Sequence, residues 1–481
     1  MTEVHIIGGG LAGSEAAWHL AERGHHVVIH EMRGVKGTAA HKTDRLAELV
    51  CSNTFKSTEV TNAHGLLKAE MRVLGSIVLD AADGARVPGG TALAVDRDVF
   101  STAVHDRVTS HPRVRVERGE TTELPSPGII ATGPLTSDDL AETIRKRLGL
   151  ASLAFYDAIA PIVAAESVDE SIVFRASRYG KETMPASVTR VLDPNGTGGA
   201  DANADVDTDG AAAGGAPEGA YINCPMNRDQ YEAFITALSE ADQFTAHEFD
   251  KVPYFEGCMP VEEIARRGRE SLRFGPMKPV GLDDPRTGRW PYAVVQLRSE
   301  DRAGRMRNLV GFQTRLRIPE QQRVFRMIPG LENAEFLRFG SIHRNAYVNS
   351  PAALTPHLSL RDDPQVLFAG QLTGVEGYTE STATGLIAAI NLDRMLRGES
   401  PVIPPPTTML GALYRYLREA DPKHFQPMNA NFGLLEELAS PPRDKAKKKA
   451  LYAERALRDL RAWAAGAGVG IDEAGAGHSS V

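Results

Sequence analysis

The sequence predicts an α/β protein in which a Rossmann-like dinucleotide-binding domain carries an inserted α+β domain. Two stretches predict the Rossmann-like part: a strand, glycine turn, helix and strand at residues 4–31, and a further strand, glycine turn and helix at residues 366–396. Between them, alternating apolar runs at residues 162–164 and 171–174 predict the insertion. The expected order is therefore one Rossmann half, an inserted domain and a second Rossmann half.

The N-terminal unit has the features of a dinucleotide site. Apolar residues 4–7 predict a buried strand, and the turn that follows consists of Gly8, Gly9, Gly10, Leu11, Ala12 and Gly13. Gly8 allows a tight turn, Gly10 lets the backbone approach a pyrophosphate, and Gly13 lets the helix pack closely on the strand. The second strand of the unit ends at Glu31, which is placed to accept hydrogen bonds from a ribose.

A second glycine-marked helix start lies far along the chain. Residues 366–369 predict a strand, Gly370 begins a glycine-rich turn, and residues 381–396 predict a helix. Residues 127–133 predict another buried strand, whose closing turn at Gly133 passes close to the cofactor in a doubly wound sheet. Two separated turns of this kind are typical of flavin sites, so the pattern favours FAD over NAD and predicts an FAD-binding domain.

The chain is long enough for more than one domain. It has 481 residues, of which 42% are hydrophobic, and these can supply sizeable cores. Residues 65–82 and 445–461 have helical spacing, and residues 193–218, rich in Gly, Ala and Asp, predict a disordered loop. The expected division is an FAD-binding first part at 1–170, an inserted substrate domain at 171–304, an FAD-binding second part with C-terminal helices at 305–465, and a flexible tail at 466–481.

The composition predicts a soluble, cytoplasmic protein. The first residues do not have the basic segment and apolar core of a secretory signal, and no run approaches the ~18 apolar residues of a membrane helix. The net charge of −8 argues against nucleic-acid binding over the whole surface. Local basic patches could still bind a nucleic acid.

The three cysteines, Cys51, Cys224 and Cys258, are widely separated and contain no C-x-x-C pair. This pattern argues against a disulfide framework or a zinc site, and we predict no metal site. Cys51 lies just after the first unit, in a polar loop expected to face the flavin, whereas Cys224 precedes a proline in the inserted domain. A buried structural thiol remains an alternative for each of them.

Several long blocks carry a resemblance to one family. They include ELVCSN at Glu48, VPGGTALAVDRDVFS at Val87, NCPM at Asn223, FEGCMPVEEIARRGRESLRFGPMKPVGL at Phe255 and LFAGQLTGVEGYTESTATGLIAAIN at Leu367. In these blocks the chain closely resembles the folate- and FAD-dependent tRNA uracil-5-methyltransferases (TrmFO), which are relatives of the GidA-type flavoproteins. The likeness runs from the first strand to FQPMNANFG at Phe425, and residues 193–218 look like an addition.

The resemblance implies an activity and its cofactors. Methylenetetrahydrofolate supplies the one-carbon unit, reduced FAD carries and reduces it, and NADH or NADPH supplies the electrons. The product is 5-methyluridine at position 54 in the tRNA T-loop, so tRNA is the expected partner, with no membrane and no obligate protein partner. Because the sequence has no second Rossmann unit, we expect the nicotinamide to visit the flavin only transiently.

The resemblance also implies site residues. C5 of uracil is a poor nucleophile until a thiolate adds to C6, so the reaction requires a cysteine. Cys51 and Cys224 match family cysteines regarded as functional, one as the nucleophile and the other as support or as the base for the C5 proton; which does which stays open. We expect the flavin half of the cofactor site between Gly370 and Thr384, with Gln371 and Glu376 in contact with the cofactor. The candidates for tRNA phosphate contacts are Arg266, Arg267, Arg269, Arg273, Arg315 and Arg317.

Three alternatives remain open at this stage. The same chemistry could act on rRNA, and no sequence feature separates that reading from the tRNA one. A generic FAD oxidoreductase would oxidise NADH without methylating RNA. A non-catalytic FAD-binding protein would tolerate replacement of Cys51 and Cys224 in every assay.

Overall fold

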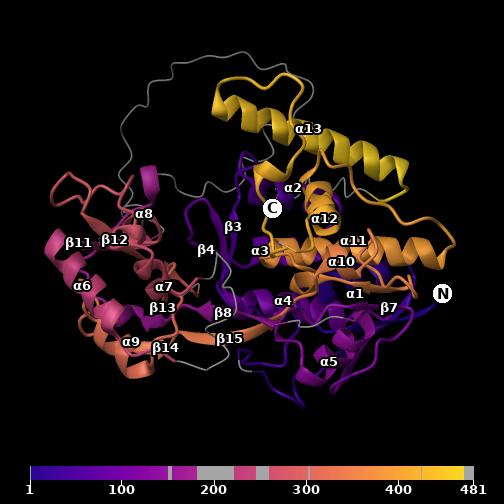
Figure 1. Ribbon diagram of the computed structural model, residues 1–481, viewed down its shortest axis with the longest axis horizontal. Helices are drawn as coiled ribbons and strands as arrows, with labels where there is room; N and C mark the ends of the chain where they lie inside the picture. The colour runs from indigo at the N-terminus through magenta and orange to yellow at the C-terminus, as the bar shows by residue number, and fades with distance from the viewer. Residues whose placement is uncertain are drawn as a thin grey trace, which may run out of the picture.

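The computed structural model describes residues 2–38, 40–149, 154–180, 221–244, 259–301, 304–423 and 425–470; at 154–159, 180 and 341–345 only the backbone is described. The loop expected at 193–218, the third cysteine, Cys258, and most of the expected tail lie outside the described residues. Figure 1 shows two lobes, with the first and last parts of the chain in one and the middle part in the other.

The first lobe is built on a five-stranded parallel sheet. Its strands, in spatial order, are β16 (Val366–Phe368), β7 (Gly128–Ile130), β1 (Glu3–Ile7), β2 (His26–Glu31) and β6 (Val114–Arg118). Because the strands are parallel, the turns that follow β1, β7 and β16 leave the same edge of the sheet and lie close together. This arrangement confirms the predicted Rossmann-like fold and brings the glycine turns at Gly8, Gly133 and Gly370 to one place.

Two helices pack on each other behind these turns. Helix α1 (Leu11–Glu22) follows β1, and helix α11 (Tyr378–Leu396) follows the turn after β16. Most of their residues are buried, as expected for helices that cover a parallel sheet. The two ends of the chain thus form one core, although more than three hundred residues separate them.

Further helices complete the first lobe. The stretch 65–82, expected to be helical, forms α2 (Ala63–Val73) and α3 (Ile77–Gly84), which are separated at Gly75, where φ is +77°. Ser76 then caps α3, because its hydroxyl accepts a hydrogen bond from the N–H of Leu79. The other helices are α4 (Arg97–Thr109), α5 (Asp138–Leu148), α10 (Ser350–Ala353), α12 (Met409–Glu419) and α13 (Lys445–Gly466). A small antiparallel sheet of β3 (Thr54–Ser57), β5 (Ala92–Val95) and β4 (Arg86–Val87) borders them.

The second lobe contains a six-stranded antiparallel sheet. Its order is β10 (Phe174–Arg175), β11 (Tyr221–Met226), β12 (Ala293–Ser299), β13 (Met306–Leu309), β9 (Ile162–Ala164) and β14 (Phe336–Arg338). Helices α6 (Arg228–Glu240), α7 (Val261–Arg266), α8 (Ser271–Phe274) and α9 (Ile318–Phe325) belong to this lobe. The sheet therefore begins before and ends after the range 171–304 that the sequence suggested, because β9 and β14 pair with each other across the insertion.

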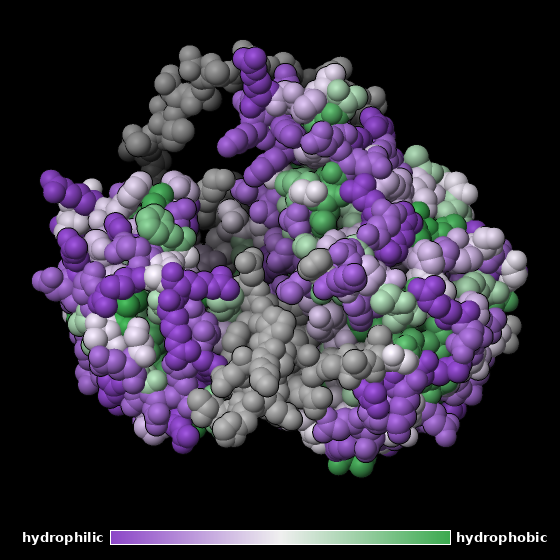
Figure 2. Space-filling view, in the orientation of Figure 1, coloured by the Kyte–Doolittle hydropathy of each residue, from purple (hydrophilic) through white to green (hydrophobic). Residues whose placement is uncertain are grey.

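An antiparallel pair, β8 (Ala154–Ile159) and β15 (Ser341–Ala346), joins the lobes, and Figure 1 shows it running between them. On the face drawn in Figure 2, hydrophilic residues cover most of both lobes and hydrophobic residues form only scattered patches. Among the helices that the structure describes, none has both the length and the apolar character that a membrane span requires.

Candidate functional site

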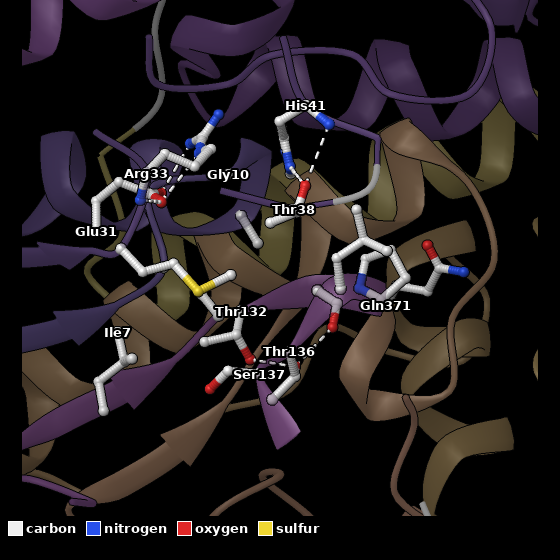
Figure 3. A pocket seen from close by; sticks show the side chains of 18 of the residues that line it. Ile7, Gly10, Glu31, Arg33, Thr38, His41, Thr132, Thr136, Ser137 and Gln371 are labelled. Carbon is white, nitrogen blue, oxygen red and sulfur yellow. Dashed lines mark hydrogen bonds and ion pairs between the residues drawn. The ribbon is translucent and has the colours of Figure 1, made fainter. Parts of the chain in front are cut away.

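Two adjoining cavities lie at the edge of the first sheet where the glycine turns meet. The dinucleotide cavity, of about 960 Å³, is lined by the turn after β1, the end of β2 and the turns after β7 and β16 (Figure 3). The thiol cavity, of about 1050 Å³, is lined by Cys51, Lys56 and Arg298 among others. Gln371 and Tyr378 line both cavities, so the two spaces share a wall.

The first glycine turn is shaped for close approach. Gly8 has φ +98°, and a Cβ there would lie 2.7 Å from the carbonyl oxygen of Ala131. A Cβ at Gly13 would lie 1.9 Å from the carbonyl oxygen of Gly8, so only glycine lets α1 start this close to β1. At Gly10 a Cβ would meet no atom within 4 Å, and no side chain caps the start of α1 there. Open space in front of uncapped N–H groups fits the pyrophosphate of a dinucleotide.

Glu31 lies on the wall of the dinucleotide cavity, and protein groups already bind its carboxylate. One oxygen accepts hydrogen bonds from the N–H of Gly9 (2.9 Å) and from Arg33 Nη2 (2.7 Å), and the other accepts from the N–H and Nε of Arg33. Burial opposes the charge of this carboxylate, but the hydrogen bonds and charge of Arg33 hold the pKa of Glu31 at about 2. Figure 3 shows Arg33 against Glu31, so a ribose must share these acceptors or displace Arg33.

The turn after β16 supplies the other half of the cavity. Gly370 has φ +75°, and its N–H donates to Thr384 Oγ1 at 2.7 Å, which ties the turn to helix α11. The next residue, Gly385, packs on α1 so closely that a Cβ there would lie 2.3 Å from the carbonyl oxygen of Ala12. Helices α1 and α11 therefore fix the two glycine turns relative to each other.

The residues predicted to bind the cofactor fall into three groups. Those that line the dinucleotide cavity are Gly8, Gly10, Leu11, Ala12, Glu31, Gly133, Gly370 and Gln371. Glu376 lines the thiol cavity, together with Gln371. Gly9, Gly13 and Thr384 line neither cavity, and they support the turns through the contacts given above.

Cys51 is half-buried on the wall of the thiol cavity, next to the wall shared with the dinucleotide cavity. Its N–H donates to the hydroxyl oxygen of Tyr378 at 2.8 Å, and that hydroxyl donates to the carbonyl oxygen of Ser52 at 2.9 Å. Burial, together with the neighbouring Cys51, raises the pKa of Tyr378 above its usual range, so the hydroxyl keeps its proton. Sequence reasoning missed Tyr378, although it lies in the block quoted for the resemblance.

The thiol cavity is also lined by charged groups in fixed positions. Lys56 has φ +63°, a conformation that is unfavourable for a residue with a side chain and is found most often at functional sites. Glu380 is buried, and its carboxylate lies 3.0 Å from His64 Nδ1. Burial opposes the charge of this carboxylate, but the hydrogen bond from His64 and the charge of Lys56 hold the pKa of Glu380 at about 2.

Lys68 binds backbone carbonyls next to these groups, and its burial gives a prediction about how stability depends on pH. Its fully buried Nζ donates to the carbonyl oxygens of Phe55 (2.7 Å) and His64 (2.8 Å), and burial lowers the pKa of Lys68 to about 7. A lysine of the unfolded chain titrates near 10.4, so between pH 7 and pH 10 the unfolded chain binds more protons. We therefore expect the contribution of Lys68 to the free energy of unfolding to rise with pH, by at most about 1.4 kcal/mol per pH unit.

The measurement compares thermal midpoints at pH 7 and pH 9 for the wild type and for Lys68→Met. Between pH 7 and pH 9, the thermal midpoint of the wild type should rise more, or fall less, than that of Lys68→Met. Lys447→Met, which changes an exposed lysine of α13, is the control and should follow the wild type. Equal pH responses of the wild type and Lys68→Met would show that Lys68 titrates normally.

The structure places Cys224 away from both cavities. It lies on β11, fully buried in the core of the second lobe, and it lines neither the thiol cavity nor the dinucleotide cavity. Burial, and then the charge of Glu332, raise the pKa of Cys224 above its usual range, which disfavours a reactive thiolate. The expected pairing of Cys51 with Cys224 at one site is therefore not present in this conformation.

Thiol labelling tests this difference. With iodoacetamide at neutral pH, we expect Cys51 to react at least about a hundredfold faster than Cys224, because the buried thiol is reached only when the second lobe opens. Peptide mass spectrometry over a time course measures both rates in one sample, and labelling in denaturant provides the unprotected reference. Equal rates in the folded protein would contradict the buried position of Cys224.

The arginines proposed for phosphate contacts have different surroundings. Arg267 is exposed and has no ion pair with any described residue. Arg266, Arg269 and Arg317 are also exposed but face Glu263 (2.7 Å), Glu232 (2.7 Å) and Asp242 (3.9 Å), respectively. Exposed ion pairs of this kind are weak and can exchange for a phosphate.

The other two arginines make close contacts with neighbouring side chains of the second lobe. Arg315 is 7% exposed, its Nε donates to Gln243, and its guanidinium pairs with Glu263. It is therefore not available to a phosphate, which corrects the expectation from the sequence. Arg273 lies over the ring of Tyr292, 4.0 Å from the ring centre, and pairs with Glu270 at 2.9 Å.

Comparison with known proteins identifies the family. The family model described as glucose inhibited division protein A matches residues 3–192 and 206–400. A Geobacter sulfurreducens protein named methylenetetrahydrofolate–tRNA-(uracil-5-)-methyltransferase TrmFO is 53% identical over 464 residues, which is 96% of this chain and 99% of that protein. A protein of the same name from Desulforudis audaxviator is 51% identical over 463 residues, 96% of this chain and 98% of that protein. The chain belongs to the TrmFO family, within the wider GidA family.

The solved structures agree with this assignment at the level of fold. Aquifex aeolicus GidA in its form II crystal matches with a TM-score of 0.66 at 15% sequence identity, over 98% of this chain and 74% of that one. The form I crystal gives a TM-score of 0.63. Every residue that lines the two cavities falls within the ranges that the family model matches, so both cavities belong to the shared part of this TrmFO-family chain.

Proposed function

We propose that this chain is a methylenetetrahydrofolate–tRNA-(uracil-5-)-methyltransferase. It transfers the one-carbon unit of methylenetetrahydrofolate to C5 of a uridine in tRNA, with FAD and NAD(P)H as the source of electrons. The observation that carries the proposal is Cys51, a thiol on the wall of a cavity that adjoins a dinucleotide cavity. The family supports it, because relatives with this name are about half identical over nearly the whole chain.

The dinucleotide cavity would hold FAD. The N–H groups at the start of α1 would bind the pyrophosphate, and Gly370 and Gln371 would lie beside the flavin ring at the wall shared with the thiol cavity. When bound, FAD supplies the electrons that reduce the transferred one-carbon unit to a methyl group. The proposal follows from the uncapped helix start, the open space at Gly10 and the left-handed turn at Gly370.

The thiol cavity would hold the reacting uracil. A thiolate adds to C6, which makes C5 nucleophilic, and C5 then forms a bond to the methylene carbon. Loss of the C5 proton and cleavage of the bond between that carbon and its carrier nitrogen, which releases the carrier, leave a methylene group on C5. Two electrons and a proton, which the reduced cofactor would supply as a hydride equivalent, convert this group to methyl, and elimination of the thiolate restores the ring. We propose Cys51 as the thiol that contacts the ring. Arg97 Nη2 donates to its carbonyl oxygen at 3.0 Å and Arg338 Nη2 donates to the preceding carbonyl at 3.1 Å, so two guanidinium groups hold the backbone that carries this thiol.

Cys224 remains the second cysteine proposed from the family. In the conformation described it lies in the core of the second lobe, so it could reach the uracil only after that core opens. Faster alkylation of Cys224 when unmodified tRNA is added would support such a role. An unchanged slow rate would leave Cys51 as the thiol in contact with the ring.

We propose that tRNA lies along the second lobe at Arg266, Arg267, Arg269 and Arg317. The side chain of Phe274, which is 74% exposed, lines one shallow surface hollow together with Arg267, Arg269 and Ile264. Exposed aromatic rings between basic side chains suit unpaired RNA bases, which stack on the ring while the cations bind phosphates. This surface borders the thiol cavity, because a Cβ at Gly311 on the cavity wall would lie 2.6 Å from Pro276, two residues beyond Phe274.

Binding of tRNA at two or more salt concentrations tests this surface. Arg267→Ala should weaken binding and reduce the slope of log affinity against log salt by roughly 0.7–0.9. Phe274→Ala should weaken binding with little change in slope, because stacking does not release counterions. The control is Arg305→Ala, which removes an arginine that is 83% exposed and lies elsewhere on the lobe. If Arg267→Ala and Phe274→Ala both bind like the control, the tRNA lies elsewhere.

The experiment that tests the function uses the purified FAD-loaded protein, labelled methylenetetrahydrofolate, NADPH and unmodified tRNA. Label should appear in 5-methyluridine, and a transcript with cytidine in place of the uridine at position 54 should remain unlabelled. Label in an rRNA transcript and not in tRNA would show that the substrate is rRNA. Oxidation of NADPH without label in either RNA would leave only an FAD oxidoreductase.

A further inference from the structure

The backbone around Cys51 is held by side chains and not by secondary structure. Residues 48–52 belong to no helix or strand, yet four consecutive carbonyl oxygens accept side-chain hydrogen bonds. The acceptors and donors are Leu49 with Arg97 Nη1 (2.8 Å), Val50 with Arg338 Nη2 (3.1 Å), Cys51 with Arg97 Nη2 (3.0 Å), and Ser52 with the hydroxyl of Tyr378 (2.9 Å). A loop bound at every carbonyl has one position, and so has its thiol.

The donors come from both lobes. Arg97 begins α4 and Tyr378 begins α11, which belong to the first lobe, whereas Arg338 ends β14 in the second. Arg97 itself is held by the second lobe, because its Nε lies 2.6 Å from a carboxylate oxygen of Glu300, the residue after β12. Three of the four carbonyl contacts therefore depend, directly or through Glu300, on where the second lobe sits.

The neighbouring residue, Asn53, makes the same connection. Its side-chain oxygen accepts from Arg298 Nε at 2.9 Å, and its amide donates to the carbonyl oxygen of Ser299 at 2.8 Å. The amide also donates to Val95 in the first lobe at 2.9 Å, so one fully buried side chain bridges the lobes. The end of β12, residues 298–300, thus lies directly against the loop that carries Cys51.

Burial raises the free-energy cost of losing these contacts. The side chain of Glu300 is 1% exposed, and its other oxygen, Oε1, has no hydrogen-bond partner among the described residues. Arg338 has no ion pair within the described part of the chain, and its one hydrogen bond there goes to Val50. Removing Glu300 leaves the half-buried guanidinium of Arg97 without its counter-ion, and removing Arg338 leaves the carbonyl of Val50 without its donor.

We propose that Arg338 and Glu300 are positioning residues through which the second lobe sets the position of the Cys51 thiol. This inference rests on the function proposed above, because it deepens the account of the same site. Its consequence is that Cys51 reaches its reactive position only while the second lobe is seated against the loop. These contacts would then couple the binding of RNA to the second lobe with the position of the thiol in the first lobe.

The test compares Arg338→Ala, Arg338→Lys and Glu300→Gln with a control in the same lobe, Arg323→Ala, whose arginine is half-exposed, pairs with Glu320 and donates to the carbonyl oxygen of Ala237. Arg338→Ala should lower kcat for tRNA methylation by roughly a hundredfold, because small displacements of a reacting group cost that much, with KM for tRNA changed by less than about twofold. Glu300→Gln should act in the same direction, and Arg338→Lys, which keeps a donor, should recover part of kcat. NADPH-driven flavin reduction should stay close to that of the control, whereas the thermal midpoint should fall, because each variant leaves a polar group without its partner.

The alkylation rate of Cys51 is the second readout, and it does not need methylation. A displaced loop should change that rate by at least about fivefold in Arg338→Ala and not in Arg323→Ala. A normal kcat together with a normal Cys51 rate in Arg338→Ala would overturn the inference, and a raised KM alone would make Arg338 an RNA contact instead. If the wild type methylates no tRNA, the proposed function fails, while the alkylation rates still decide whether Arg338 and Glu300 position the thiol.

Discussion

Cys51→Ala should abolish methyl transfer to tRNA while FAD remains bound. Without a thiol on the wall of the thiol cavity, C5 of the uracil is not activated, and we expect a loss of at least about a thousandfold in kcat. Cofactor binding should persist, because Cys51 does not line the dinucleotide cavity and its backbone contacts with Tyr378 and Arg97 do not involve the sulfur. The variant should therefore be a flavoprotein that takes electrons from NADPH and delivers no methyl group.

Three measurements on the same variant make the result specific. The visible absorbance of the purified protein reports bound FAD, NADPH-driven bleaching reports flavin reduction, and nucleoside analysis of tRNA reports methylation. We expect normal FAD absorbance and normal flavin reduction, but no methylation of tRNA. Methylation at more than a few per cent of the wild-type rate would show that Cys51 is not the thiol that adds to the uracil, and would favour Cys224 instead.

Gly385→Ala should have the largest effect on the fold of the cofactor site. A Cβ at this position would lie 2.3 Å from the carbonyl oxygen of Ala12 and 2.8 Å from its carbonyl carbon, and neither backbone atom can move without shifting helix α1. Overpacking of this kind costs about 1–3 kcal/mol, sometimes more. Because α1 and α11 fix the two glycine turns, the displaced helix should also weaken FAD binding.

The matched control is Gly84→Ala at the end of α3, where a Cβ would meet no atom within 4 Å. There the replacement should be neutral or stabilise by up to about 1 kcal/mol, since alanine favours a helix more than glycine does. Thermal midpoints and FAD content after purification measure both variants. Equal FAD content and equal midpoints in the two variants would contradict the close packing of α1 on α11.

The sequence was sufficient to predict the parts of the site that depend on local pattern. The apolar run before Gly8, the glycine spacing and the acidic residue at the end of the second strand predicted β1, α1 and β2 in the places where they occur. The strand before Gly370 and the turn that begins at Gly370 were equally visible. Each of these elements is specified within about thirty residues, so no tertiary knowledge was needed.

The contacts that hold Cys51 could not be predicted in this way. Arg338 and Tyr378 lie far along the chain from the residues whose carbonyls they bind, and an arginine before a phenylalanine or a tyrosine after a glycine carries no local pattern. The arginines show the same limit, because nothing in the sequence distinguishes the buried Arg315 from the exposed Arg317. Such roles are set by long-range packing.

For Cys224, the sequence contained a pattern that could have been used. Alternation along β11 puts Ile222, Cys224 and Met226 on one face, and apolar neighbours on both sides predict that this face is the buried one. That pattern favours the structural alternative for the thiol over a surface role. The two cysteines are alike as family matches, and their positions in the fold separate them.

The origin of the methyl group tests the central claim most directly. The FAD-loaded protein is incubated with NADPH, unmodified tRNA and methylenetetrahydrofolate that carries deuterium at both methylene positions, and the 5-methyluridine of the digested tRNA is weighed by mass spectrometry. The account predicts a methyl group that retains both deuterium atoms, formed by the wild type and not by Cys51→Ala. A methyl group without deuterium, or the same deuterated product from Cys51→Ala, would contradict it.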